Sequence, residues 1–152
     1  MEWVVAVAVV VAFGYLALSD VRTMKVPIRR SIQTTTLALG GLGVVGVTDQ
    51  NWSALGSAVV GAVGITVIQL VPVIVQRRRG TPMIGRADVR LGIPFGFTLG
   101  YFGLVALFWG FLLANLAGLG WSLATGRNRI PFVAFMAAGM GAGLLIAAIS
   151  AS

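Results

Sequence analysis

Long uncharged runs separated by short polar segments dominate the pattern of the chain. Hydrophobic spans are predicted at Trp3–Leu18, at Thr34–Val47, from the turn VTDQNWS to about Val75, and at Pro131–Ile149. The stretch Leu91–Ala124 carries no charge over 34 residues. As a single helix it would be about 51 Å long, whereas the hydrocarbon core of a bilayer is about 30 Å thick. We therefore expect it to fold back near Gly100–Gly103, which gives six transmembrane helices in total.

Charged residues fall into three groups that alternate with these spans. The groups are Asp20, Arg22, Lys25, Arg29 and Arg30; Arg77, Arg78, Arg79, Arg86, Asp88 and Arg90; and Arg127 with Arg129. With six spans, the first, third and fifth loops lie on one side of the membrane and hold all 11 basic residues, whereas Glu2 and Asp49 lie on the other side. The positive-inside rule then predicts cytoplasmic basic loops and two extracytoplasmic termini.

The composition excludes a soluble globular protein. Hydrophobic residues occupy 58% of the 152 positions, the mean hydropathy is +0.97, and the 11 basic and 4 acidic residues are too few to form a charged shell. We expect an all-α, multi-pass bundle in the cell membrane, with residues 1–152 forming one domain. In such a protein the net charge of +7 indicates cytoplasmic loops and anionic lipid as the partner, not nucleic acid.

The residue types that are missing restrict the possible chemistry. The sequence contains no Cys and no His. This excludes disulfides, thiol nucleophiles, imidazole acid–base catalysis and zinc held by Cys or His. The only acids are Glu2, Asp20, Asp49 and Asp88, so we predict neither a metal site nor a cofactor.

Two of these acids are predicted to lie at the same membrane face. Asp20 ends the first span and Asp88 begins the fourth, so both are expected near the cytoplasmic boundary on different helices. Two carboxyl groups that share one proton can supply the base and the acid of aspartyl proteolysis. Structural roles are the alternatives: Asp88 can cap the fourth helix, and Arg22 with Lys25 can compensate Asp20 at a helix C-terminus.

The fourth span is predicted to be short. From Asp88 to Phe102 it has 15 residues, or about 22 Å of helix, which is less than a bilayer core. Either the bilayer thins there or Asp88 lies recessed below the membrane surface.

Three segments around these positions resemble motifs of the type IV prepilin peptidase family, a family of membrane aspartyl proteases. The segment SDVRTMKVPIRRS is similar to the first motif, an Asp followed six or seven residues later by Ile/Val-Pro, here Asp20, Val26 and Pro27. The segment MIGRADVRLGIPFGFTLG is similar to the Gly-x-Gly-Asp motif and its following basic residue, here Gly85, Asp88 and Arg90. The segment RIPFVAFMAAG is similar to the last-helix motif, here Pro131, Phe132 and Phe135.

The resemblance implies an endopeptidase without a cofactor that removes a short basic leader from a prepilin-like protein substrate on the cytoplasmic side of the membrane. It implies that Asp20 and Asp88 are catalytic. The residues that would bind substrate or support the site are Pro27, Gly85, Ala87, Arg90, Pro131 and Phe132. Ala87 stands where the family usually has a second Gly, and Ile28 stands where a polar residue commonly follows the Pro. A paired-cysteine region associated with N-methylation in larger members has no counterpart here, so peptidase activity alone is expected.

Two other functions are compatible with the sequence. A small proton-coupled transporter subunit would place an ionisable residue near the bilayer midplane. The polar residues predicted in mid-span are Gln69 and Asn115, which are uncharged. A non-catalytic membrane scaffold would use Asp88 only as a helix cap, a role that Asn fills equally well.

Glycines recur at four-residue spacing in two of the spans. They are Gly92, Gly96 and Gly100, and again Gly139 and Gly143. Such stripes of small residues let helix backbones approach closely in lipid. We expect these contacts inside the bundle and not at a dimer interface, and the sequence leaves the oligomeric state open.

Overall fold

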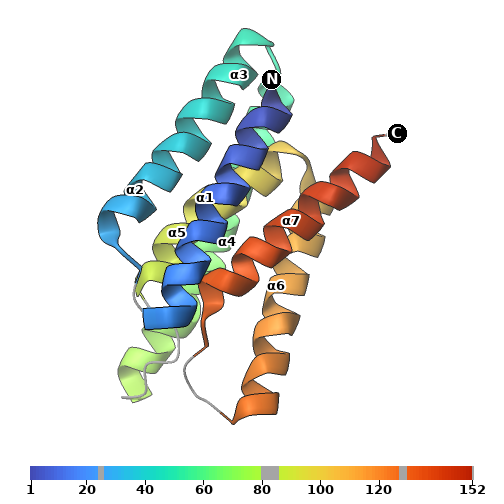
Figure 1. Cartoon of the computed structure of the whole chain (residues 1–152). Coiled ribbons are helices and arrows are strands. Elements are labelled where there is room, and N and C mark those ends of the chain that lie inside the picture. The colour runs from blue at the N-terminus through green and yellow to red at the C-terminus, as the bar shows by residue number, and fades with distance from the viewer. Residues whose placement is uncertain (24–25, 80–85, 127–129, 152) are drawn as a thin grey trace.

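The computed structural model describes residues 1–23, 26–79, 86–126 and 130–151, and all regular structure in this part of the chain is helical (Figure 1). The elements in chain order are α1 (Glu2–Thr23), α2 (Ile28–Thr36), the π-helical segment η1 (Leu37–Gly41), α3 (Leu42–Thr48), α4 (Trp52–Arg79), α5 (Arg86–Tyr101), α6 (Leu104–Thr125) and α7 (Phe132–Ser150). Because α2, η1 and α3 follow one another without a break, they form a single rod over residues 28–48. The described elements therefore make six rods.

The lengths and composition of the rods indicate a multi-pass membrane protein. Among the described helices, five are long and apolar enough to cross a bilayer: α1, the rod of residues 28–48, residues 52–71 of α4, α6 and α7. Many large apolar side chains on these helices face outward, Val4, Val7 and Val11 of α1 among them. In water such a surface would be unfavourable, whereas in a bilayer it contacts lipid. The all-α helix bundle expected from the sequence is thus observed.

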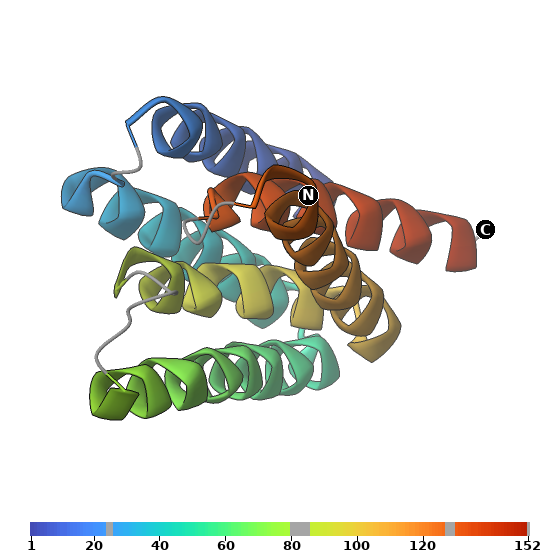
Figure 2. The ribbon, with the colours of Figure 1, turned by 90° about the horizontal axis from the view of Figure 1, so that it is seen from below.

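Helix α5 is the shortest of the six rods and the most central one. It has 16 residues and packs against α2, α4, α6 and α7. Seen from the other direction in Figure 2, α5 lies between α4 on one side and α1 with α7 on the other. Its buried face joins the main core cluster, to which α1 contributes Phe13 and Leu16 and α5 contributes Leu91 and Phe95. An apolar helix this short is protected by neighbouring helices over most of its surface.

Close backbone contacts hold the α4–α5 and α6–α7 pairs together, as the glycine spacing predicted. A Cβ atom on Gly96 of α5 would overlap the backbone of Gly61 of α4, and a Cβ on Gly100 would lie 2.5 Å from the Ser57 carbonyl oxygen. On α7, a Cβ on Gly143 would lie 2.6 Å from the Ala106 carbonyl oxygen of α6. The prediction that these glycines pack within the bundle is therefore confirmed.

The fold-back expected in the long uncharged stretch is also observed. Helix α5 ends at Tyr101 and α6 begins at Leu104, with Gly103 between them at a φ of 111°. Only glycine adopts this backbone angle without steric strain, because it has no Cβ atom. The predicted position of the turn, Gly100–Gly103, is correct.

Helix ends differ from the predicted ends wherever the spans meet charged segments. Helix α1 continues to Thr23, five residues past Leu18, and α2 begins at Ile28, six residues before Thr34. Hydrophobicity reports the part of a helix that lies in lipid, whereas backbone hydrogen bonding continues into the polar boundary. The prediction therefore underestimated these helices at the ends that carry Arg22, Arg29 and Arg30.

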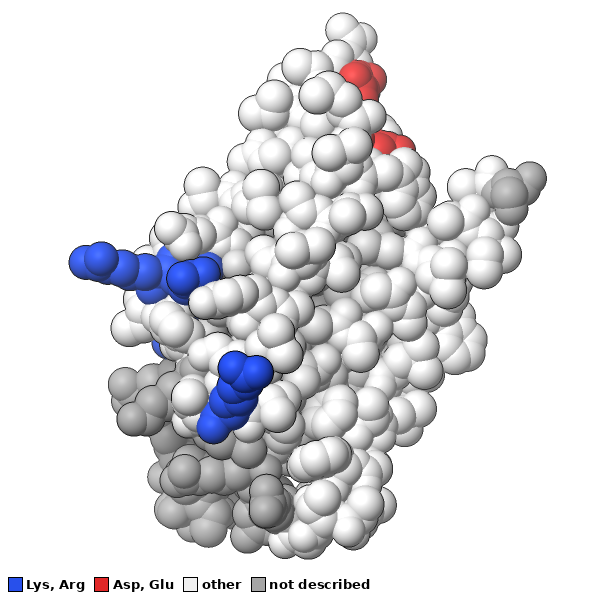
Figure 3. Space-filling model, in the orientation of Figure 1, with Lys and Arg blue, Asp and Glu red and all other residues white. Residues whose placement is uncertain are grey.

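The charges of the described residues separate along the bundle axis. Arg22 lies in the last turn of α1, Arg29 and Arg30 in the first turn of α2, and Arg90 near the start of α5. We call the end of the bundle where α1 finishes and α2 and α5 begin the basic end. In Figure 3 the visible acidic side chains lie near the opposite end, where α1 begins and α3 meets α4. Glu2 and Asp49 belong to those two segments.

Candidate active site

Asp20 is the last member of a buried stripe along α1. The buried residues of this helix are Ala6, Val9, Phe13, Leu16 and Asp20, which recur every three or four positions and therefore share one face. The four apolar members are at most 1% exposed, and Asp20 itself is 7% exposed. The carboxylate thus continues the core at the basic end instead of facing solvent or lipid.

Asp88 holds the corresponding place on α5. It lies in the first turn of this helix and is 8% exposed. Leu91, Phe95 and Leu99 follow at intervals of three and four residues, and each is fully buried. Because α5 begins at Arg86, Asp88 lies inside the helix. The N-cap position suggested for it from the sequence is therefore wrong.

The two stripes pack against each other. The rings of Phe13 on α1 and Phe95 on α5 meet edge to face, with their centroids 6.4 Å apart. Asp20 follows Phe13 by seven residues, and Asp88 precedes Phe95 by seven. Seven residues amount to about 10 Å of helix and come within about 20° of two full turns, so each aspartate shares the face of its phenylalanine. Since α1 runs toward the basic end and α5 runs away from it (Figure 1), each aspartate is displaced from its phenylalanine toward the basic end.

A third helix reaches Asp20 through its backbone. The Val133 N–H donates a hydrogen bond to Oδ2 of Asp20 at 3.2 Å, and this contact is buried. Val133 lies in the first turn of α7, whose N-cap residue, Pro131, makes no capping bond through its own side chain. Asp20 therefore caps α7 from a distant part of the chain. The partial positive charge at a helix N-terminus also favours a carboxylate there.

Val133 could not be recognised directly from the sequence, because a backbone donor can belong to any residue type except proline. The available signal was indirect. Pro131 stands immediately before α7 and has no side-chain oxygen, so the first N–H groups of α7 require an acceptor from elsewhere. Both Pro131, which is buried, and Phe132, which packs on the main core cluster, belong to the segment predicted to support the site. The structure brings this segment to Asp20.

The remaining predicted site residues differ in their placement. Pro27 is exposed at the N-cap of α2, where its carbonyl accepts a hydrogen bond from the Ser31 N–H at 3.1 Å. Arg90 is exposed on α5, two residues after Asp88. Gly85 lies outside the described residues, and Ala87 is described only as part of the α5 backbone. Neither Pro27 nor Arg90 is therefore part of the buried face that carries the two aspartates.

A buried amide lies close to the same face of α5. Gln69 of α4 is 4% exposed, and neither its Nε2 nor its Oε1 has a hydrogen-bond partner among the described residues. Its side chain lies against Gly92, where a Cβ atom would overlap the amide oxygen. Gly92 follows Asp88 by one helical turn, so Gln69 is one turn deeper in the bundle than the carboxylate.

The other two acids, Glu2 and Asp49, lie toward the opposite end of the bundle. Glu2 lies in the first turn of α1 and Asp49 directly follows α3, whereas Asp20 lies near the end of α1 and Asp88 in the first turn of α5. All four acids of the sequence thus lie toward one end of the bundle or the other. Over the described ranges, no three carboxylate side chains are grouped so that they could hold a metal ion.

Comparisons with known proteins add nothing to this geometry. No protein-family model matches the chain, and neither the curated proteins nor the solved structures compared with it include a match. A functional assignment therefore rests on the sequence motifs and on the positions of Asp20 and Asp88.

Proposed function

We propose that the chain is a membrane-embedded aspartyl endopeptidase that removes the leader from type IV prepilin-like proteins at the cytoplasmic face. The observation that carries the proposal is that Asp20 and Asp88 are both buried toward the basic end, on two helix faces that meet through Phe13 and Phe95. The resemblance of the three segments to prepilin peptidase motifs supplies the substrate class.

The proposed topology has six transmembrane helices, with both termini extracytoplasmic. Its support is the separation of charge along the bundle, with described arginines at the basic end and acidic side chains near the other (Figure 3). Helix α5, the fourth span in chain order, is added to the five long apolar helices in this topology. Its 16 residues give about 24 Å of helix, which requires a locally thin bilayer or flanking residues that reach the interface. In this orientation both aspartates face the cytoplasmic boundary.

The two carboxyl groups have complementary tasks in peptide hydrolysis. The ionised one takes a proton from a water molecule, whose oxygen then forms a bond to the carbonyl carbon of the scissile amide. The protonated one donates its hydrogen to the carbonyl oxygen, which gives a neutral tetrahedral diol. When this diol collapses, one of its hydroxyl groups returns a proton to the second carboxylate and re-forms a C=O bond, the C–N bond breaks, and the proton taken from water passes to the leaving amine. One proton shared by the pair before the reaction is shared again afterwards.

The position of the pair fits cleavage beside a hydrophobic helix. Below Asp20 and Asp88 the two stripes are wholly apolar, with Leu16, Phe13 and Phe95 in the next turns. An amide bond that leaves the bilayer at this level meets the carboxyl groups, while the apolar segment that follows it remains in lipid. A leader joined directly to a membrane helix has this arrangement.

The test is cleavage of a co-expressed prepilin in membranes, followed by the change in substrate size. Asp20→Asn and Asp88→Asn should each lower the rate by about 10²-fold or more, because acid–base catalysis by a positioned group contributes about 10²–10⁴-fold. Asp49→Asn is the matched control, since Asp49 is an exposed acid after α3 and belongs to the other end. Wild-type cleavage by both the Asp20 and the Asp88 variants would overturn the proposal.

The contact between Asp20 and Val133 favours a second candidate, a non-catalytic scaffold in which Asp20 only caps α7. An Asn side chain also accepts a hydrogen bond from a backbone N–H, so Asp20→Asn preserves the cap. A scaffold would keep its partner interactions in this variant. A peptidase would keep its stability and lose its activity, so the same substitution separates the two functions.

A further inference from the structure

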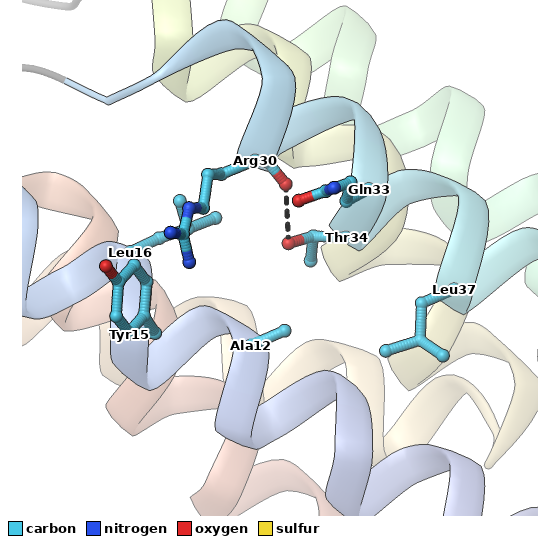
Figure 4. A pocket seen from close by; sticks show the side chains of 7 residues that line it. All are labelled: Ala12, Tyr15, Leu16, Arg30, Gln33, Thr34 and Leu37. Carbon is cyan, nitrogen blue, oxygen red and sulfur yellow. Dashed lines mark hydrogen bonds between the residues drawn. The ribbon is translucent and has the colours of Figure 1, made fainter.

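A cleft opens between α1 and α2 beside the buried stripe that ends at Asp20, and Leu16 belongs to both. Its volume is about 150 Å³, below the roughly 300–1,000 Å³ of typical small-molecule sites, so it is large enough for a part of a ligand and not for a whole one. Figure 4 shows the side chains that line it, which are Ala12, Tyr15, Leu16, Arg30, Gln33, Thr34 and Leu37. Three of these come from α1 and four from the rod that begins with α2.

The lining of the cleft is polar at one end and apolar at the other. Arg30 and Tyr15 face each other across the polar end, with the guanidinium carbon 4.3 Å from the centroid of the Tyr15 ring. Gln33 lies beside them. Ala12 and Leu37 line the opposite end, farther from the basic end along their helices. The cleft is therefore amphipathic along its length.

Arg30 brings the only charge among the lining residues. In the described part of the chain no carboxylate forms an ion pair with Arg30, and its guanidinium lies over the face of the Tyr15 ring. The hydroxyl of Thr34 already donates to the Arg30 backbone carbonyl at 3.0 Å, which leaves Arg30 and the amide of Gln33 as the polar groups directed to a ligand. A guanidinium on an aromatic face keeps its N–H groups available for an oxyanion.

The depth of the cleft matches the headgroup region of a bilayer. Arg30 lies in the first turns of its rod, at the basic end, and Tyr15 precedes Asp20 by five residues. Tyrosine and arginine concentrate where lipid headgroups meet the hydrocarbon, because each has an apolar stem and a polar tip. Both Tyr15 and Arg30 are exposed at the bundle surface, so the cleft is open to surrounding lipid.

We propose that this cleft binds one anionic phospholipid. The phosphate group contacts the Arg30 guanidinium and the Gln33 amide, and the beginning of an acyl chain lies against Ala12, Leu16 and Leu37. An anionic phospholipid matches both the positive charge of the polar end and the apolar character of the other end. A free phosphate would contact only the polar end, and a neutral lipid would gain nothing from the positive charge. The site is independent of the proposed peptidase activity.

The test is lipid retention by the purified, delipidated protein in detergent, measured by native mass spectrometry in an equimolar mixture of dioleoyl phosphatidylglycerol and dioleoyl phosphatidylcholine. The wild-type protein should retain phosphatidylglycerol in preference. Arg30→Gln should lower the ratio of the two bound lipids about fivefold, since one basic residue contributes about 1 kcal/mol at an anionic lipid surface. Arg29→Gln is the matched control, because Arg29 is the exposed neighbour that does not line the cleft, and it should leave the ratio of the two bound lipids close to that of wild type.

Two further arms separate the possible occupants. Ala12→Leu fills the apolar end and should reduce retained phosphatidylglycerol, with the melting temperature in detergent checking that the bundle is intact. Inorganic phosphate at the concentration of the lipid should not displace it. Equal retention of both lipids, an equal effect of Arg29→Gln and Arg30→Gln, or displacement by phosphate would each overturn the proposal.

Discussion

The Asp20 carboxylate accepts a hydrogen bond from the Val133 N–H, and it is buried at the same end of the bundle as Asp88. The first contact is structural, because it satisfies one of the open donors of α7. The burial of Asp20 at the same end as Asp88 is what the proposed catalytic role requires. A single side chain thus joins the folding of α7 to the proposed chemistry, and substitutions that differ only in hydrogen-bonding capacity can separate the two.

The comparison of Asp20→Ala with Asp20→Asn tests the structural role. Loss of a capping acceptor typically costs about 1 kcal/mol, so we expect Asp20→Ala to lower the free energy of unfolding by about that amount. Asp20→Asn keeps the acceptor and should remain close to wild type. Thermal unfolding in detergent measures both. Equal stability of the Ala and wild-type proteins would show that the bond to Val133 does not contribute.

Gln69 offers a second prediction at this scale. Burial of an amide without partners costs about 1–3 kcal/mol, and Met has nearly the same shape as Gln without the polar atoms. We therefore expect Gln69→Met to leave the stability unchanged or to raise it. Gln69→Glu should lower it, because it buries a charge one turn from Asp88. A clear loss of stability in Gln69→Met would show that the amide is hydrogen-bonded in the protein.

The sequence identified the residues whose chemistry is rare in this chain. With four acids in 152 residues, Asp20 and Asp88 were prominent, and their buried positions agree with a shared site. Pro27 and Arg90 were named with them but are exposed. Val133 was missed because its contribution is a backbone N–H, which carries no mark in the sequence. Burial of Asp20 and Asp88 could not be derived from composition, since acids at helix ends are more often solvated.

At the scale of helices, glycine contacts determine which pairs are tightly joined. Gly96 of α5 lies directly against the backbone of Gly61 of α4, whereas Gly64 on α4 faces open space. Both glycines are helical, so helix propensity acts on both in the same way. The contact with a neighbouring backbone is the difference between them.

This difference predicts opposite effects of the same substitution. Gly96→Ala should lower the free energy of unfolding by about 1–3 kcal/mol, because backbone atoms cannot move aside as a side chain can. Gly64→Ala should be neutral or stabilising by up to about 1 kcal/mol, since Ala is the better helix former. Melting temperatures in one detergent compare the two variants. A tolerated Gly96→Ala would contradict the close packing of α4 and α5.

Hydrophobic pattern located the helices well but not their ends. The turn at Gly103 was predictable because a single helix of that length exceeds the bilayer. The extension of α1 to Thr23 and the early start of α2 at Ile28 were not, because polar residues continue a helix without any hydrophobic signal. The π-helical segment η1 was likewise missed, since an extra residue in one turn depends on packing and not on residue type alone.

At the scale of the whole molecule, the distribution of charge supports the proposed orientation. Arginines of the described residues gather at the basic end, and Glu2 and Asp49 belong to segments at the opposite end. The proposed orientation places the basic end in the cytoplasm, where it meets anionic lipid and a leader peptide that has not crossed the membrane.

Cysteine labelling in intact cells tests this orientation, because the chain has no cysteine of its own. Ser53→Cys, at the exposed start of α4, should react with a membrane-impermeant maleimide added outside. Thr23→Cys, exposed at the end of α1, should react only after the membrane is permeabilised. The reverse pattern would place Asp20 and Asp88 outside the cytoplasm and contradict the proposed site of cleavage.

Glycine packing also groups four of the helices into two tightly joined hairpins. Helices α4 and α5 form one hairpin held by backbone contact, and α6 with α7 forms another. Asp88 belongs to the first hairpin, whereas Asp20 is tied to the second through Val133. The helices that carry these two carboxyl groups, α1 and α5, meet through side chains, the rings of Phe13 and Phe95, and not through glycine backbone contacts. A small rigid-body rotation of one hairpin against the other would change the distance between the Asp20 and Asp88 carboxyl groups without unfolding any helix.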